Sequence, residues 1–161
     1  EQKQAVAQAV GLGSIRYPML SVDNNKIVTF DWETAISFDG NSAPYIQNAH
    51  VRANSILKKA GAVPAQAAFD YALDALEVEL IDRLSRFPAT VQQAALDYKP
   101  LHMANYAYDL AKTFHAFYHV VPVLQAETEK MKNARLRLVA AARQTLANAL
   151  RLLDIQAPEV M

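Results

Sequence analysis

Residues 134–161 read ARLRLVAAARQTLANALRLLDIQAPEVM, and this stretch decides the fold. Its apolar side chains recur every three or four positions, which is the spacing of one face of an α-helix. The residues that form this face are Val139, Ala142, Leu146, Leu150 and Leu153. Polar and basic residues form a ridge on the opposite face, and they are Lys130, Arg137, Gln144, Asn148 and Arg151. The pattern predicts a long amphipathic helix that packs against other helices on one side.

Four further helical segments are predicted upstream, and proline or glycine bounds most of them. Pro44 suits the first turn of a helix that stops at Gly61. A second helix has one apolar stripe, formed by Phe69, Leu73, Leu76, Leu80 and Leu84. Pro88 opens a shorter helix, and Pro100 opens a long one that Pro122 ends. We therefore expect an all-α bundle of about five helices over residues 44–161.

The first 43 residues have a different character. All four glycines of the chain lie at or before Gly61, and the short β-branched run Ile27–Phe30 follows a turn signal. We expect a mixed segment here with an extended stretch or a strand. Trp32 and Tyr45 are expected to wedge the junction with the bundle. Gly40 would allow a turn, and Asn41 or Ser42 would cap the helix that Pro44 begins.

Composition limits the class of protein. The chain has 161 residues, of which 52% are hydrophobic and 20% charged, so it can form one globular core. It contains no cysteine, which excludes disulfides, Cys-based zinc sites and thiol nucleophiles and is typical of a reducing compartment. No apolar run approaches the roughly 20 residues of a membrane span, and the first residues lack the pattern of a signal peptide. We expect a cytoplasmic protein that does not bind membranes.

Charge is balanced overall but not along the chain. Sixteen basic residues match sixteen acidic ones, so the molecule has no bulk attraction for nucleic acid. Residues 70–82 carry five acids and no base, whereas residues 130–151 carry six bases and no acid. The basic ridge could follow phosphates, although most such faces are only solvated. Arg135 projects near the apolar stripe, so we expect a carboxylate, such as one from the acidic helix, to hold it.

Nothing in the sequence predicts catalysis or a metal site. His115 and His119 have the i, i+4 spacing of zinc ligands on a helix, but Ala116 stands where a metalloprotease needs glutamate. No phosphate-cradling loop, dinucleotide fingerprint or nucleophile elbow is present. We expect no catalytic residue, no metal ligand and no cofactor in this chain.

The segment 101–121 is rich in aromatic residues and histidines. Phe114, Phe117 and Val121 follow the spacing of a helix core, whereas Tyr118 and His115 are expected at its margin. An aromatic ring close to basic residues suits unpaired RNA bases, each stack being worth about 1 to 3 kcal/mol. Tyr118 is therefore the first candidate for contact with a base, and His115 is another.

Two ordered blocks of the sequence resemble the arginyl-tRNA synthetase family. The first runs from Ile15 to Leu57 and includes DWE at 31–33 and GNSAPY at 40–45; the second is the quoted run 134–161. The resemblance covers nearly the whole chain but only the back part of the family's architecture, so the chain looks like a carboxyl-terminal fragment. It implies that residues 1–43 end a catalytic domain and that residues 44–161 form a helical, DALR-type anticodon-binding domain. The parent would use ATP on a class I catalytic domain whose signature motifs are absent here, so the fragment alone should be inactive.

The resemblance also implies roles for individual residues. An aromatic at Tyr118 would contact the anticodon loop, and a final methionine such as Met161 would close over it. The tRNA backbone would meet basic side chains, for which the candidates are Lys130, Arg137, Arg151 and Arg52. The base to be read is the central cytosine that arginine-accepting tRNAs share. Pro122 and Asn48 stand where the family usually has an aromatic and a tyrosine, so a contact could be lost at each.

The implied partner is a tRNA that accepts arginine, and the bundle is expected to be monomeric and to pack on the catalytic domain. Two other interpretations stay open. The chain could be a helical protein-interaction module whose acidic and basic helices pair with partners. It could also be the anticodon-binding domain of another class I aminoacyl-tRNA synthetase, such as the cysteine or methionine enzyme, although the 31–33 block argues against this.

Overall fold

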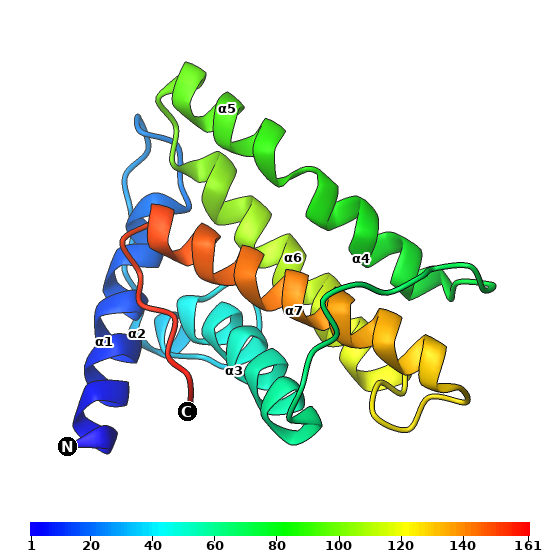
Figure 1. Ribbon diagram of the computed structural model, residues 1–161. Coiled ribbons are helices and arrows are strands. Elements are labelled where there is room, and N and C mark those ends of the chain that lie inside the picture. The colour runs from blue at the N-terminus through cyan, green and yellow to red at the C-terminus, as the bar shows by residue number, and fades with distance from the viewer.

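The computed structural model describes all 161 residues, as seven α-helices joined by irregular segments without any strand (Figure 1). The helices are α1 (Gln2–Leu20), α2 (Trp32–Ala35), α3 (Ala43–Ala60), α4 (Ala75–Ser85), α5 (Phe87–Asp97), α6 (Leu101–Val120) and α7 (Glu129–Leu152). Helices α3 to α7 form the bundle, and α1 crosses its end beside α3. The all-α prediction is confirmed, and the five helices of the bundle are those expected.

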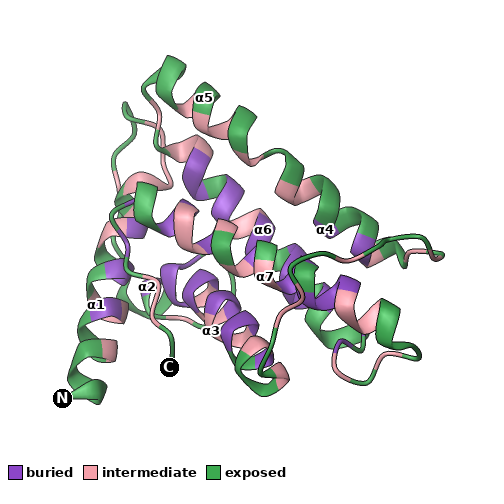
Figure 2. Cartoon of the chain, in the orientation of Figure 1, coloured by how far each residue is buried: buried purple, intermediate pink, exposed green.

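The core lies where α3, α6 and α7 meet (Figure 2). Phe114 and Phe117 of α6 are fully buried there, and the predicted apolar face of α7 is buried along its whole length. Burying a large apolar side chain contributes roughly 1.5 to 3 kcal/mol, so this three-helix contact contributes strongly to stability. Helices α4 and α5 follow one another along α6 and cover its outer side.

Local capping explains where the helices of the bundle begin. The Ser42 hydroxyl accepts a hydrogen bond from the Tyr45 amide at 3.3 Å, and Gly40 turns the preceding chain at φ 81°. Both features match the sequence prediction. At α4 the Asp74 side chain accepts from the amide of Leu76, while the Glu77 carboxylate accepts from the Asp74 amide at 2.9 Å. This capping box fixes the start of α4.

Helix α1 was not expected, because glycine within it was taken as a sign of irregular structure. Gly13 is in fact needed for close packing: a Cβ at this position would lie 3.2 Å from the Ala43 Cβ and 3.2 Å from the Ile155 Cγ2. A Cβ added at Gly11 would meet no atom within 4 Å, so this glycine does not face a neighbour. The mixed segment expected over residues 1–43 thus contains a long helix at residues 2–20 that the sequence analysis did not identify.

Three further expectations are corrected. Phe69 and Leu73 precede the Asp74 cap, so α4 is shorter than the predicted stripe. The run Ile27–Phe30 forms no strand, since no neighbouring segment pairs with it. The Trp32 side chain is 59% exposed and packs edge-on against Phe30, so it does not wedge the junction.

Candidate nucleic-acid interface

Tyr118 lies near the end of α6, and 38% of the surface of this residue is exposed. The Arg52 guanidinium of α3 sits over the ring, 5.1 Å from its centre, in the geometry of a cation–π contact. The His119 ring meets Tyr118 edge-on at 5.3 Å, and Phe114 lies beneath it at 6.5 Å. The tyrosine is thus supported from the core and presents the rest of its surface to solvent.

This ring forms one wall of a hollow of about 260 Å³. The hollow lies between α3, the end of α6 and the loop that leads to α7, and its lining residues are Arg52, Ser55, Ile56, Lys59, Tyr118, Val121, Pro122, Val123 and Leu124. Cations therefore stand on the α3 side, and apolar side chains and loop backbone on the other. This combination suits a flat base with an attached phosphate. The sequence prediction missed Lys59, whose helical spacing of seven from Arg52 could have revealed it.

His119 fixes the position of Arg52. The Arg52 Nη1 lies 3.2 Å from the His119 Nε2, and because arginine can only donate, the imidazole nitrogen is the acceptor. This contact with the imidazole holds the guanidinium beside Tyr118. The expected role of Arg52 at the RNA backbone stays a prediction, but its location beside the candidate ring is now clear.

His115 lies deeper than the margin expected for it. Only 8% of its surface is exposed, its Nε2 donates to the Tyr45 carbonyl at 3.3 Å, and its ring packs 4.6 Å from that of Tyr45. Burial lowers the pKa of His115 to about 4, so the ring is neutral at physiological pH. In this structure it supports the start of α3, and its predicted contact with a base is untested.

Met161 lies in a different hollow from Tyr118. Its side chain is 39% exposed and shares a hollow of about 510 Å³ with α1 residues that include Val6 and Val10. The tail carrying it runs along α3, where a row of polar side chains holds it by hydrogen bonds: Gln47 donates to Gln156, His50 to Pro158 and Asn54 to Glu159. The structure therefore does not bring Met161 and Tyr118 together in one hollow. That row was missed, although its spacing of three and four residues is visible in the sequence.

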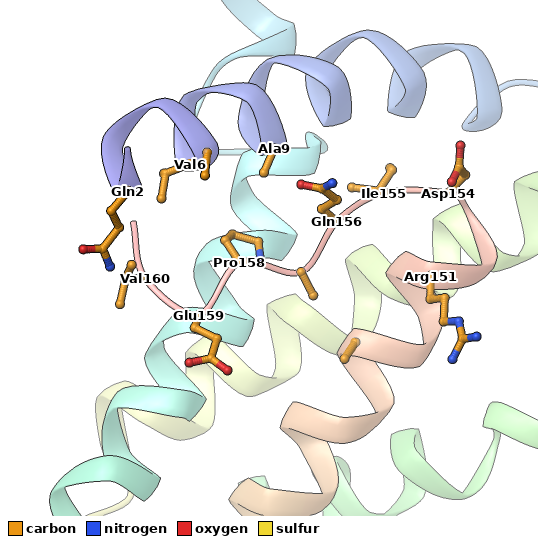
Figure 3. Close-up of a pocket in the computed structure, with 13 residues that line it drawn as sticks. Gln2, Val6, Ala9, Arg151, Asp154, Ile155, Gln156, Pro158, Glu159 and Val160 are labelled. Carbon is orange, nitrogen blue, oxygen red and sulfur yellow. The ribbon is translucent and has the colours of Figure 1, made fainter.

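The candidate phosphate contacts on α7 differ in their surroundings. Lys130 forms an ion pair with Asp70, so part of its charge is neutralised. Arg137 is exposed on the ridge, and none of the ion pairs of the structure involves it. Arg151 lies at the edge of a larger hollow of about 590 Å³ between α1, α7 and the tail (Figure 3). Arg137 and Arg151, unlike Lys130, thus have no ion-pair partner.

Arg135 is a buried structural residue, as its place near the apolar stripe predicted. Its Nε donates to the Glu77 carboxylate of α4 at 3.0 Å, and both side chains are almost fully enclosed. The predicted carboxylate partner from the acidic helix is therefore confirmed.

None of the helices is long and apolar enough to cross a membrane.

Comparison with known proteins gives consistent similarities. The family model described as the DALR anticodon binding domain matches residues 46–161. The arginine–tRNA ligases of Thermococcus sibiricus and Pyrococcus abyssi are 46% and 47% identical to the chain, and each match covers all of the chain and 26% of the relative. The solved arginyl-tRNA synthetase of Thermus thermophilus superposes with a TM-score of 0.93 at 38% identity, over 100% of this chain and 28% of that one. The chain thus spans about a quarter of the length of these relatives.

Proposed function

This chain belongs to the DALR anticodon-binding domain family, and we propose from that premise that it recognises the anticodon loop of tRNA that accepts arginine. The relatives that support this substrate are arginine–tRNA ligases. The same similarity favours RNA binding over a protein-interaction module and arginine over another amino acid.

The observation that carries the proposal is the half-exposed Tyr118 ring beneath the Arg52 guanidinium. A base that leaves the stack of an anticodon loop can pack against the exposed part of the tyrosine ring, while Arg52 and Lys59 approach the phosphates. The pair is already assembled in the free protein, so binding would not have to order it.

Reading of the central cytosine requires an acceptor for its exocyclic amino group. The loop Val121–Leu124 borders the hollow and offers backbone carbonyls, which accept from an amino group but cannot donate to the corresponding keto group of uracil. We propose that this loop supplies the discrimination and that Tyr118 supplies stacking. Met161 would act from the neighbouring hollow only if the anticodon loop spans both.

We further propose that the chain is the RNA-reading part of a longer enzyme that joins arginine to tRNA with ATP. Supporting this, the segment 19–38 carries several exposed apolar side chains, which are Met19, Ile27, Trp32, Ile36 and Phe38. The side chain of Ile27 is 95% exposed. Packing of this segment on a catalytic domain would remove these side chains from water. The enzyme would act in the cytoplasm as a monomer.

The test compares binding of this chain to the anticodon stem-loop of an arginine tRNA with binding to the same RNA carrying uracil as its middle base. We expect tighter binding of the cytosine loop. The Tyr118→Ala variant should lose about 10- to 100-fold in affinity, since one base stack is worth roughly 1 to 3 kcal/mol. Tyr118→Phe retains the ring and is the matched control, for which we expect a small change. Equal affinity of the unaltered chain for both loops would refute the proposal.

A further inference from the structure

A buried arginine that does not line the Tyr118 hollow forms a hydrogen bond to the loop that borders it. Arg135 of α7 donates through Nη1 to the carbonyl oxygen of Pro122 at 2.9 Å. Pro122 lines the hollow, whereas Arg135 does not. The segment 121–128 between α6 and α7 has no regular structure that would fix this carbonyl by itself. The hydrogen bond from Arg135 is thus a direct constraint on the wall of the hollow.

Arg135 is in turn fixed by Glu77. The arginine donates to both oxygens of this carboxylate, from Nε at 3.0 Å and from Nη2 at 3.4 Å. Glu77 also accepts from the Tyr71 hydroxyl at 2.6 Å and from the Asp74 amide at 2.9 Å. Because the guanidinium is planar and its donors have fixed directions, binding the carboxylate sets the direction of the donor that meets Pro122.

A stabilising role alone does not account for a charge pair in this position. Glu77 is fully buried and Arg135 nearly so, and enclosing two charges costs about as much as their attraction returns. Burial alone would raise the pKa of Glu77, yet the hydrogen bonds from Arg135 and Tyr71 lower it overall, so the carboxylate stays charged. What such a pair does supply is one defined geometry, here shared by α4, α7 and the loop at the hollow.

We propose that Arg135 is a positioning residue for RNA recognition, which holds the Pro122 carbonyl and with it the loop 121–124 in the arrangement that admits the middle anticodon base. The inference rests on the proposed function and deepens it, because it assigns discrimination between bases to a residue that the RNA never touches.

The Arg135→Lys variant tests this. Lysine keeps the charge and can pair with Glu77, but its single ammonium group cannot reproduce the fork that also reaches Pro122. Tyr71→Phe is the matched control, since it removes a hydrogen bond to Glu77 but keeps every donor of Arg135, including the one that meets Pro122. Both variants should lower the melting temperature of this chain. We measure their affinities for the cytosine and uracil stem-loops well below both melting temperatures.

We expect Arg135→Lys to weaken binding of the cytosine loop about 10-fold, so that the affinities for the cytosine and uracil loops become similar. Tyr71→Phe should keep the preference for the cytosine loop. Amide hydrogen exchange at Val123 and Leu124 should accelerate in Arg135→Lys alone. If Arg135→Lys fails to fold, Glu77→Gln replaces it, with the same expected loss of preference.

Two results would overturn the inference. One is an unchanged preference in the variant that disturbs Arg135. The other is a loss of affinity that follows the loss of stability equally in Tyr71→Phe. If the unaltered chain shows no preference between the loops, the proposed function itself fails, and the two failures are thereby distinguished.

Discussion

His115 is a titratable side chain that the fold keeps neutral, and this has a consequence for stability. Burial lowers its pKa to about 4, against about 6.5 in an unfolded chain. The unfolded state therefore binds the proton more readily, and stability is complete above pH 6.5 and declines as the pH falls towards 4. By pH 5 the difference amounts to about 2 kcal/mol, from 1.5 pH units at about 1.4 kcal/mol each.

The measurement is urea unfolding of the chain at pH 7.5 and pH 5. The His115→Gln variant keeps a donor for the Tyr45 carbonyl but cannot take up a proton in this range, so it should lose about 2 kcal/mol less between the two pH values. His50, whose pKa burial also lowers, and the carboxylates are shared by both proteins and cancel. Identical pH dependence would mean that His115 does not carry the effect.

Single residues were predictable where the helical pattern itself holds the information. Arg135 interrupts an apolar stripe, so its burial and its need for a carboxylate could be read from spacing, and Glu77 meets that need. The burial of His115 could not be read in this way, because it depends on Tyr45 of another helix covering the ring. The predicted position of Tyr118 at the helix margin was correct, because no other helix covers the outer edge of its ring.

At the scale of elements, the contact between α1 and α3 depends on one glycine. Gly13→Ala would place a methyl group 3.2 Å from the side chains of Ala43 and Ile155, so these neighbours would have to shift by a few tenths of an ångström. We expect a loss of about 1 to 3 kcal/mol, which is the usual cost of overpacking. Gly11→Ala, two residues away in the same helix, enters open space and should stabilise the protein by up to about 1 kcal/mol through helix propensity.

If the packing of α1 on α3 is as described, thermal or urea unfolding of the two variants gives changes in stability of opposite sign. Destabilisation by both would show that α1 tolerates no side chain at either site, and stabilisation by both would show that the helices can separate without cost. Since the two substitutions have the same chemistry, each is the control for the other.

The elements of the bundle were predicted better than those that precede it. Proline and apolar spacing identified all five helices, including the short helix α5, which has no fully buried residue. The start of α4 was misplaced since the stripe was extended to Phe69, although the Asp74 to Glu77 capping box was present in the sequence. Helix α1 was missed because Gly13 is explained only by the partner that it approaches, and a sequence does not show that partner.

At the scale of the whole molecule, folding rearranges a charge distribution that is polarised along the chain. The acidic residues 70–82 come to lie against the start of α7, where Glu77 pairs with Arg135 and Asp70 with Lys130. Near the other end of α7, Asp154 pairs with Arg16. Of the cations on the basic ridge, Lys130 is thus paired with a carboxylate, whereas Arg137 and Arg151 form no ion pair. The cations left for RNA are few, and they cannot be chosen from charge counts alone.

This distribution leads to a prediction for salt dependence. Arg137 is exposed without an ion pair, so Arg137→Gln should weaken binding of the arginine-tRNA stem-loop and reduce the slope of log affinity against log salt by about 0.7 to 0.9, the loss of one phosphate contact. Lys130→Gln removes the same charge from the same ridge, but this lysine is already paired with Asp70, so its slope should change less. Binding is measured between 50 and 200 mM salt, about the range over which such slopes are defined. Equal reductions in the two variants would mean that only total charge matters and that the pairing of α4 with α7 does not select the cations that meet RNA.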